Sequence, residues 1–379
     1  MLCTGLLVTP ALAQEGEDAV PPIEFHGFAS QGFILTLQNE YLADDSTDGS
    51  FEFSEVGFNF TKELTETLST GGQLFAQDLG RAGNLEPQID WFYLDYRPKD
   101  WLGLRAGRVK IPFGLYNEIQ DVDSARVPVL LPQSVYPLQS RELLFAVTGG
   151  EVYGFLRMGG FGALDYRLYG GTIFLDSDDL TPPGAGFELD FHVRYVAGGR
   201  LFWETPLEGL RVGSSYERVR LDTTAFVTGL EPSLVIENRS WLWLSSVEYV
   251  SGDFLLSAEY GRGGALQESN YPELSPALDV TDERAYVMAS QRLASWFQPG
   301  AYVSLFFPDV ENREGRENRQ LDVALTLRFD INPFWLVKAE GHFMYGTAGI
   351  LNPLRINPPD ITQADEYWAA YFLKTTAHF

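Results

Sequence analysis

The sequence ends in EYWAAYFLKTTAHF, residues 366–379, and this stretch decides the fold because its residues alternate in character. One face of the stretch carries Tyr367, Ala369, Tyr371, Leu373, Thr375, Ala377 and Phe379, and the other carries Lys374, Thr376 and His378. A period of two is that of a β-strand, and a long apolar face beside a charged one is typical of the wall of a transmembrane β-barrel. The stretch therefore predicts a lipid-facing strand.

The composition agrees with a barrel. The chain has 379 residues, of which 45% are hydrophobic and 14% aromatic. It contains no uninterrupted apolar run of the roughly 20 residues that a membrane-spanning helix requires. Its 37 Gly and 18 Tyr suit strands, tight turns and interfacial rings rather than a helical core.

The N-terminal residues indicate export. Residues 2–13 are apolar and end in Ala11-Leu12-Ala13, which matches the core and cleavage site of a secretory signal. A positively charged start is missing, so a start inside the true signal and a short buried strand are both alternatives. We expect a signal peptide over 1–13, a short N-terminal segment over 14–22 and a barrel over 23–379. The one cysteine, Cys3, would be removed with the signal, which excludes disulfides.

Short turns and longer polar connections alternate along the chain, as they do in an up-and-down barrel. The short turns are predicted near Thr65, Pro98, Gly159, Pro206, Gly252, Pro299 and Pro333. We expect about 16 strands. Counts of about 14 or 18 are alternatives because the first strands, over 25–38 and 68–78, alternate weakly.

Alternation is clearest over 321–330 and 335–345, and a third case runs over 191–203 with Phe191, Val193, Tyr195, Leu201 and Trp203 predicted outward. A soluble β-sandwich shows similar alternation and is the alternative. Tryptophans recur beside four of the predicted short turns, at Trp101, Trp203, Trp296 and Trp335. Aromatic rings gather at membrane interfaces, so this recurrence favours the transmembrane barrel.

The same parity predicts a charged interior. The residues predicted to face inward are Glu151, Arg157, Asp165, Arg167, His192, Arg194, Arg200, Arg211, Glu217, Glu248, Glu259, Arg284, Arg292, Asp322, Arg328, Lys338, Glu340 and Lys374. A barrel of about 16 strands leaves an aqueous channel unless a segment narrows it.

The longest predicted connection, from Pro112 to Phe145, follows the fifth strand and carries an apolar stretch over 127–131. Long connections of this kind are usually functional. We expect this third outer loop to fold inward and constrict the channel, with a surface loop contacting neighbouring subunits as the alternative.

Charges of both signs are candidates for the constriction: Glu118, Asp121, Asp123 and Arg126 on the loop, and Arg157, Arg167, Arg194 and Arg200 in the predicted wall. The hypothesis is that loop carboxylates face wall arginines across the passage and produce a transverse field that orients polar solutes.

Two stretches, RAGRVKIPFGLYNE over 105–118 and LLPQSVYP over 130–137, resemble the strand-to-constriction-loop passage of porins related to phosphate-selective porins. The terminal Phe379 likewise resembles the C-terminal signal of bacterial outer-membrane proteins. The resemblance implies a homotrimeric general or anion-preferring porin of the outer membrane, with Arg105, Arg108 and Lys110 as candidate pore residues. The alternative is that each of these three pairs with a neighbouring carboxylate in the wall. The chain departs from that family in having five Lys and a net charge of -25, which argues against phosphate selectivity.

Much of the excess acid lies in the predicted outer loops, at Asp44, Asp45, Asp48, Asp176, Asp178, Asp179 and Glu188. These carboxylates either bind divalent cations that bridge to lipopolysaccharide or keep the loops solvated.

Other functions find little support in the sequence. No GxSxG or HExxH motif is present, and the four histidines lie in separate predicted strands, so neither an active site nor a metal or cofactor is expected. Nucleic-acid binding is opposed by the acidic charge balance. The sequence therefore predicts passive diffusion of small hydrophilic solutes or ions, with a transporter closed at rest, a barrel enzyme or an adhesin as alternatives.

Overall fold

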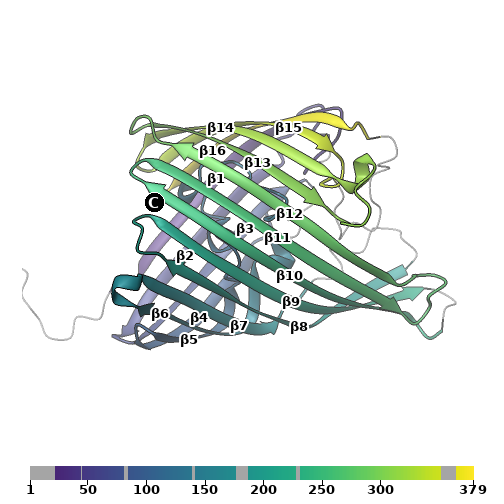
Figure 1. Ribbon diagram of the computed structural model, residues 1–379, viewed down its shortest axis with the longest axis horizontal. Coiled ribbons are helices and arrows are strands. Elements are labelled where there is room, and N and C mark those ends of the chain that lie inside the picture. The colour runs from purple at the N-terminus through teal and green to yellow at the C-terminus, as the bar shows by residue number, and fades with distance from the viewer. Residues whose placement is uncertain are drawn as a thin grey trace, which may run out of the picture.

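The computed structural model of the chain describes residues 22–43, 45–80, 84–138, 141–175, 187–227, 231–350 and 364–379. Sixteen strands form a single closed antiparallel barrel in which each strand pairs with its neighbours in sequence (Figure 1). This confirms the predicted all-β up-and-down barrel and its strand number. It also excludes the soluble sandwich, because no second sheet packs on the first among the described residues.

The strands are β1 (Glu24–Leu37), β2 (Phe53–Thr65), β3 (Leu68–Leu79), β4 (Gln88–Lys99), β5 (Leu102–Lys110), β6 (Ala146–Arg157), β7 (Ala163–Thr172), β8 (Phe187–Glu204), β9 (Leu210–Val227), β10 (Leu234–Ser251), β11 (Phe254–Ser269), β12 (Leu278–Gln291), β13 (Phe297–Phe307), β14 (Gln320–Asn332), β15 (Trp335–Gly346) and β16 (Tyr367–His378). No helix in the described ranges is long and apolar enough to cross a membrane.

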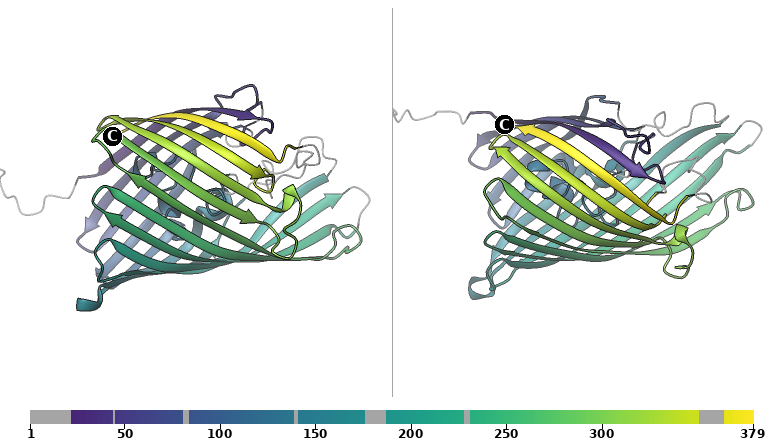
Figure 2. Two further views of the ribbon diagram at one scale, coloured as in Figure 1. Left: turned by 45° about the horizontal axis from the view of Figure 1, so that its top comes forward. Right: turned by 90° about the horizontal axis from the view of Figure 1, so that it is seen from above.

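Closure depends on the pairing of the first strand with the last. β1 and β16 are antiparallel over ten residue pairs, from Phe28 with His378 to Leu37 with Ala369. The C-terminus lies at the barrel end that carries the short turns, among them η4 (Gly159–Phe161) (Figure 1). The four longest strands, β8 to β11, extend further at the opposite end, as the views in Figure 2 also show.

The short turns lie close to their predicted places, with two shifts. Pro98 belongs to β4, so the turn falls at residues 100–101. Pro299 belongs to β13, where it pairs with Leu327, and the turn lies earlier, at 292–296. Proline is tolerated near the start of a strand, as at Pro299, and at a bulge, as at Pro98 in the register shift between Tyr96 and Lys99. A proline by itself therefore does not locate the turn.

Alternation on β14 agrees with the prediction. Val323 and Leu325 are 41% and 59% exposed on the outer face, whereas Asp322 and Thr326 on the inner face are buried. β16 behaves alike, with Leu373 exposed and Lys374 buried. Trp101, Trp203, Trp296 and Trp335 are exposed beside the short turns, as expected for an interfacial belt.

On β8 the predicted parity is wrong for the outer half of the strand. A register shift between Val193 and Tyr195 leaves Arg194 as an extra residue. A one-residue bulge reverses the face of every residue on one side of it. Val193, predicted outward, is therefore buried, while His192 and Arg194, predicted inward, are exposed. Beyond the bulge Leu201 and Trp203 are outward as predicted.

A charge on the lipid-facing surface tests this arrangement. Leu325→Arg at the middle of β14 is expected to lower the free energy of unfolding by about 2–4 kcal/mol, because the guanidinium would enter hydrocarbon. Leu278→Arg, at the outer end of β12, is the matched control and should cost about 0–1 kcal/mol near the interface. Urea unfolding in phospholipid vesicles measures both, and equal losses would contradict the assignment of depth.

Candidate functional site

The connection between β5 and β6, here called segment 111–145, contains η1 (Asn117–Ile119), η2 (Asp123–Ala125) and α1 (Arg141–Leu144). Its apolar side chains are buried although it is a connection: Ile111, Val129 and Leu130 are at most 2% exposed. Connections normally run over a protein surface. The burial of this one has to be explained by what it contacts.

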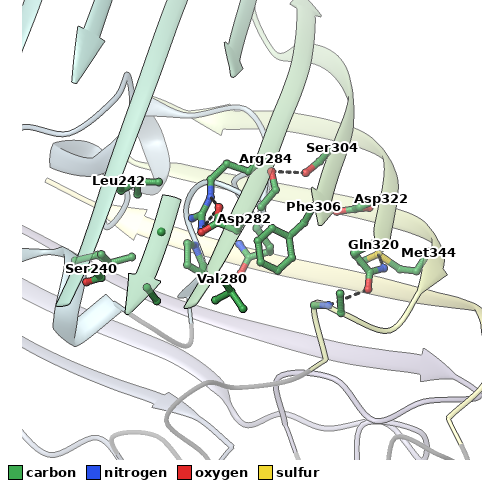
Figure 3. A pocket seen from close by; sticks show the side chains of 18 of the residues that line it. Ser240, Leu242, Val280, Asp282, Arg284, Ser304, Phe306, Gln320, Asp322 and Met344 are labelled. Carbon is green, nitrogen blue, oxygen red and sulfur yellow. Dashed lines mark hydrogen bonds and ion pairs between the residues drawn. The ribbon is translucent and has the colours of Figure 1, made fainter. Parts of the chain in front are cut away.

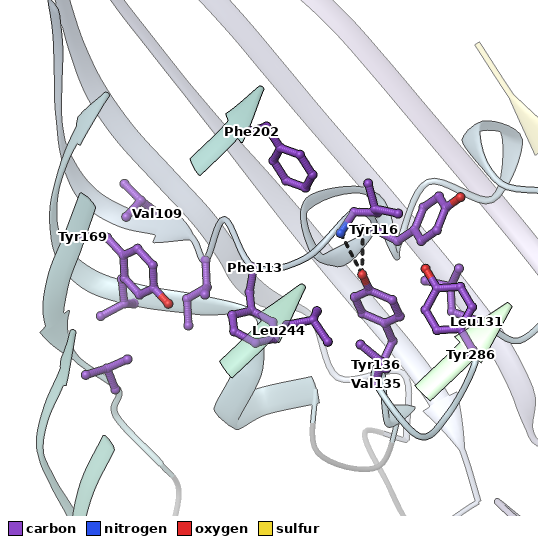
Figure 4. Close-up of a cluster of buried hydrophobic side chains, with 14 of the residues drawn as sticks. Val109, Phe113, Tyr116, Leu131, Val135, Tyr136, Tyr169, Phe202, Leu244 and Tyr286 are labelled. Carbon is purple, nitrogen blue, oxygen red and sulfur yellow. Dashed lines mark hydrogen bonds between the residues drawn. The ribbon is translucent and has the colours of Figure 1, made fainter. Parts of the chain in front are cut away.

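One set of contacts is apolar. Ile111, Phe113 and Tyr136 of the segment belong to one buried cluster with Leu244 of β10 and Tyr286 of β12 (Figure 4). Leu244 and Tyr286 lie on the inner face of the wall, because their strand neighbours Trp243 and Val287 are exposed. The segment therefore packs against the inner face of strands that are distant from β5 in the barrel order.

Hydrogen bonds hold the same region. The amide of Gly114 donates to Ser215 Oγ of β9 at 3.0 Å, and the amide of Leu115 donates to Glu259 Oε1 of β11 at 3.1 Å. Glu259 also accepts hydrogen bonds from the hydroxyls of Tyr136 and Tyr286. A carboxylate that accepts several hydrogen bonds satisfies its lone pairs without a cation, so these contacts make burial of Glu259 acceptable.

A second attachment lies on β15. The amides of Val129 and Leu130 donate to the two carboxylate oxygens of Glu340 at 2.7 and 2.8 Å. His342 Nε2 lies 2.9 Å from Glu340 Oε1, and His342 Nδ1 lies 2.9 Å from Asp322 Oδ1. Glu340 thus contacts His342 of the wall on one side and accepts hydrogen bonds from the segment on the other.

Asp123 forms a third attachment. Its carboxylate accepts from Lys338 Nζ at 2.8 Å and from Thr376 Oγ1 at 2.7 Å, and Lys374 Nζ lies 3.8 Å away. Arg126, three residues later on the segment, lies 3.4 Å from the same carboxylate. Burial raises the pKa of Asp123, but the cations, chiefly Lys338, outweigh it, and the net pKa lies below its usual range.

Glu118 lies between two wall arginines. It accepts from Arg167 at 2.7 Å and from Arg200 at 2.8 Å. Burial raises the pKa of Glu118, but Arg200 and Arg167 together lower it by more, so the net shift is downward. Arg105 lies in the same network, 3.0 Å from Glu151 and 2.7 Å from Asp95.

Two further ion pairs lie close by. Lys110 Nζ is 3.0 Å from Asp121 Oδ1, and Arg141 makes two contacts with Asp90 at 2.9 and 3.0 Å. Burial raises the pKa of Asp121, but Lys110 and Arg141 hold the net pKa below its usual range. Lys110, Asp121 and Arg141 all belong to the segment or to its first flanking strand.

The structure places most of the predicted site residues together. Those in one connected region of the segment and the wall beside it are Arg105, Lys110, Glu118, Asp121, Asp123, Arg126, Arg167 and Arg200. Arg108 donates from Nε to the carbonyl oxygen of Asp90. Two residues lie elsewhere: Arg157 is 77% exposed at a short turn beside Asp100, and Arg194 is on the β8 bulge beside Asp222.

The charges are not arranged as predicted, with loop carboxylates facing wall arginines across the passage. Glu118, Asp121 and Asp123 are each in contact with a cation rather than facing it across open space. Contact pairs neutralise one another locally, so their field over the passage is weaker than that of separated charges.

Sequence reasoning placed Glu259, Asp322, Lys338 and Glu340 on the inner face but did not assign them the role of holding the segment. The only available signal was the run Lys338, Glu340 and His342, which alternates charges along one face of one strand. The partners of that run lie about 200 residues away, as the Glu340 contacts with Val129 and Leu130 show. No local pattern predicts such a pairing.

The acidic outer-loop residues fall into two groups. Asp44, Asp176, Asp178 and Asp179 lie outside the described residues. Asp45, Asp48 and Glu188 are exposed. Among the described residues no group of three or more His, Cys, Asp or Glu is placed to hold a metal ion. The predicted signal peptide over 1–13 also lies outside the described ranges.

Neither a family model nor a curated protein sequence matches the chain. Solved structures do resemble it in fold. The anion-selective porin from Comamonas acidovorans is 13% identical with a TM-score of 0.57, covering 94% of this chain and 99% of that one. The outer membrane channel DcaP of Acinetobacter baumannii is 10% identical with a TM-score of 0.53, covering 94% of this chain and 97% of that one.

A third similar structure is the trimer form of OmpT, an outer membrane protein of Vibrio cholerae. It is 12% identical with a TM-score of 0.53, and the match covers 94% of this chain and 99% of that one. At these identities the likeness is one of fold. The chain therefore has the barrel fold of outer-membrane porins, whereas its membership of the phosphate-selective family stays a prediction.

Removing the charge of Asp123 tests the third attachment. Asp123→Asn is expected to lower the free energy of unfolding by about 3 kcal/mol, because Lys338 would stay buried without its carboxylate, whereas Lys374 would keep Glu55. The exposed Asp45→Asn is the control and should change stability by less than about 0.5 kcal/mol. Urea unfolding in lipid vesicles measures both, and equal values for the two variants would contradict the attachment.

Acid should weaken the docking of segment 111–145. A carboxylate whose folded pKa is depressed contributes stability above its unfolded pKa, and this contribution is lost as the pH falls. For Glu118, Asp121 and Asp123 the loss should begin near pH 4, where unfolded carboxyls titrate. Protease cleavage within the segment, followed between pH 7 and 3, should increase. The increase in cleavage should be smaller for Asp123→Asn than for the wild type. Identical pH profiles of cleavage for the two proteins would refute the role of Asp123.

Proposed function

We propose that the protein is a porin of the bacterial outer membrane that passes small hydrophilic solutes or ions by passive diffusion. The observation that carries the proposal is a closed barrel of 16 strands whose inner face bears charged rows while its outer face is apolar. A barrel of this size encloses an aqueous lumen. Charged inner rows require water or partners, whereas the apolar outer face suits lipid.

Segment 111–145 is the proposed constriction. Its contacts with β9, β11 and β15 run through Ser215, Glu259 and Glu340, which lie on strands far from β5 and β6 around the barrel. A segment attached in this way narrows the passage at the level of Glu118 and Asp123. Selectivity then depends on local charge rather than on the total charge of the chain.

The candidate selectivity residues are the ion pairs beside the segment. Glu118 pairs with Arg167 and Arg200, which also contact Glu151 and Asp165. The balance between these carboxylates and the two arginines sets the local preference for anions or cations. The trimer form of the similar Vibrio cholerae protein supports a homotrimer here. Membrane lipid and lipopolysaccharide are the expected surroundings, and we propose no enzymatic activity, cofactor or nucleic-acid partner.

Single-channel recording in a planar bilayer tests the proposal. The purified, folded protein is expected to produce stepwise ion currents, with steps grouped in threes for a trimer. A salt gradient across the bilayer gives the reversal potential and hence the sign of the selectivity. No current from a protein whose barrel is shown to be folded would refute the diffusion pore and favour a closed transporter.

The same recording tests the constriction. Glu118→Gln should shift the reversal potential toward anions, because it leaves Arg167 and Arg200 with less neutralising charge. Glu268→Gln is the matched control, since Glu268 is an exposed carboxylate paired with Arg239 on the outer part of the wall. Identical reversal potentials for wild type and both variants would remove Glu118 from the selectivity region.

A further inference from the structure

A cavity of about 400 Å³ lies between segment 111–145 and the inner face of β9 to β16, toward the barrel end with the longer connections (Figure 3). Its lining is mainly apolar and includes Leu242, Val280, Phe306 and Met344. Figure 3 shows the Phe306 ring and Val280 directed into this space. A lumen that serves only hydrated ions has no need of an apolar chamber, so the lining requires its own explanation.

Volume and lining together fit an organic molecule. Ligand pockets typically enclose about 300–1,000 Å³, with mostly apolar walls and a few polar groups that fix orientation. Trp368, on the inner face of β16, also lines this cavity and adds an aromatic side chain to it. Aromatic faces attract organic cations through their negative π-surface.

The charges of the lining determine the sign of the occupant. Four acidic or basic side chains line the cavity, namely Glu217, Asp282, Arg284 and Asp322. Arg284 is engaged by Asp282, with contacts of 2.7 and 2.8 Å to Asp282 Oδ1, so this pair is neutral as a unit. Asp322 is held by His342 at 2.9 Å and by the hydroxyl of Tyr302 at 3.0 Å.

Glu217 differs from the other three. It is 3% exposed, and its one side-chain partner among the described residues is the hydroxyl of Tyr169, which donates to Glu217 Oε2 at 2.7 Å. No cation of the described chain lies within ion-pair distance of it. A buried carboxylate without a cation is costly, and a cationic ligand would remove that cost.

We propose that this cavity binds an organic cation with an apolar, preferably aromatic, body, whose positive charge is directed to Glu217. The apolar body lies against Leu242, Val280 and Phe306. Binding itself does not require conduction, whereas the role of such a cation as a transported solute rests on the channel function proposed above. The cavity then acts as a selective site on the outer side of the constriction.

Titration calorimetry of the folded protein in detergent micelles tests the proposal. The probe is benzyltrimethylammonium, compared with benzoate and benzyl alcohol, which keep the ring but carry a negative charge or none. Benzyltrimethylammonium is expected to bind, and benzoate is not. Equal binding of cation and anion would overturn the proposal, because charge selection by Glu217 is its central claim.

Two variants separate charge from shape. Glu217→Gln keeps a hydrogen-bonding partner for Tyr169 but removes the charge, and should weaken binding of the cation by at least about tenfold. Val280→Trp fills the space and should abolish binding of the cation. Glu268→Gln is the control and should bind as the wild type does. Unchanged binding by Glu217→Gln would overturn the proposal even if Val280→Trp failed to fold.

Bilayer recording distinguishes a failure of the proposed cation site from a failure of the proposed channel function. Currents without calorimetric binding would refute the cation site alone. Binding without currents would refute the porin and leave the site in place. If both hold, benzyltrimethylammonium added to the side with the longer connections should reduce the wild-type current and leave that of Glu217→Gln less affected.

Discussion

The structure depends on one constraint, which is that every backbone amide and carbonyl facing lipid must be paired within the protein. An open sheet leaves two edges unpaired, and hydrocarbon offers nothing to pair them. The ladder between β1 and β16, which joins Phe28 to His378 and Leu37 to Ala369, removes both edges at once. The apolar outer face and the polar inner face follow, because a closed antiparallel sheet must assign alternate residues to lipid and to the lumen.

The closed barrel creates a second problem, because its interior is wide and its inner rows carry charge. Segment 111–145 answers part of it. The segment brings apolar side chains to Leu244 and Tyr286, backbone amides to Glu259 and Glu340, and the Asp123 carboxylate to Lys338. Buried charges are stable only with partners. The wall and the segment therefore supply partners for each other's buried polar and charged groups. Without the other, each would leave such groups unpaired.

The sequence predicted the alternation of apolar and charged residues that contact with lipid imposes on a strand. On β14 to β16 the outward positions are apolar or aromatic apart from Thr375, and each charged residue lies inside, so parity alone located Lys338, Glu340 and Lys374 correctly. Parity failed on β8 because a bulge inserts one residue without changing the composition of the strand. The side chains of His192 and Arg194 therefore lie on the face opposite to the predicted one. Parity also could not pair Glu340 with Val129 or Asp123 with Lys338, because these contacts join residues that only barrel closure brings together.

The distribution of charge has a consequence for selectivity. The chain carries 52 acidic and 27 basic residues, yet the carboxylates beside the constriction, such as Glu118 and Asp123, are matched by cations. The excess acid must then lie mostly away from these pairs, where water screens it within about 10 Å. Besides these ion pairs, a solute inside the barrel therefore meets a few buried carboxylates that have no cation. Glu217 is such a group, and it lies beside an apolar cavity, so charge and shape select for the same kind of molecule.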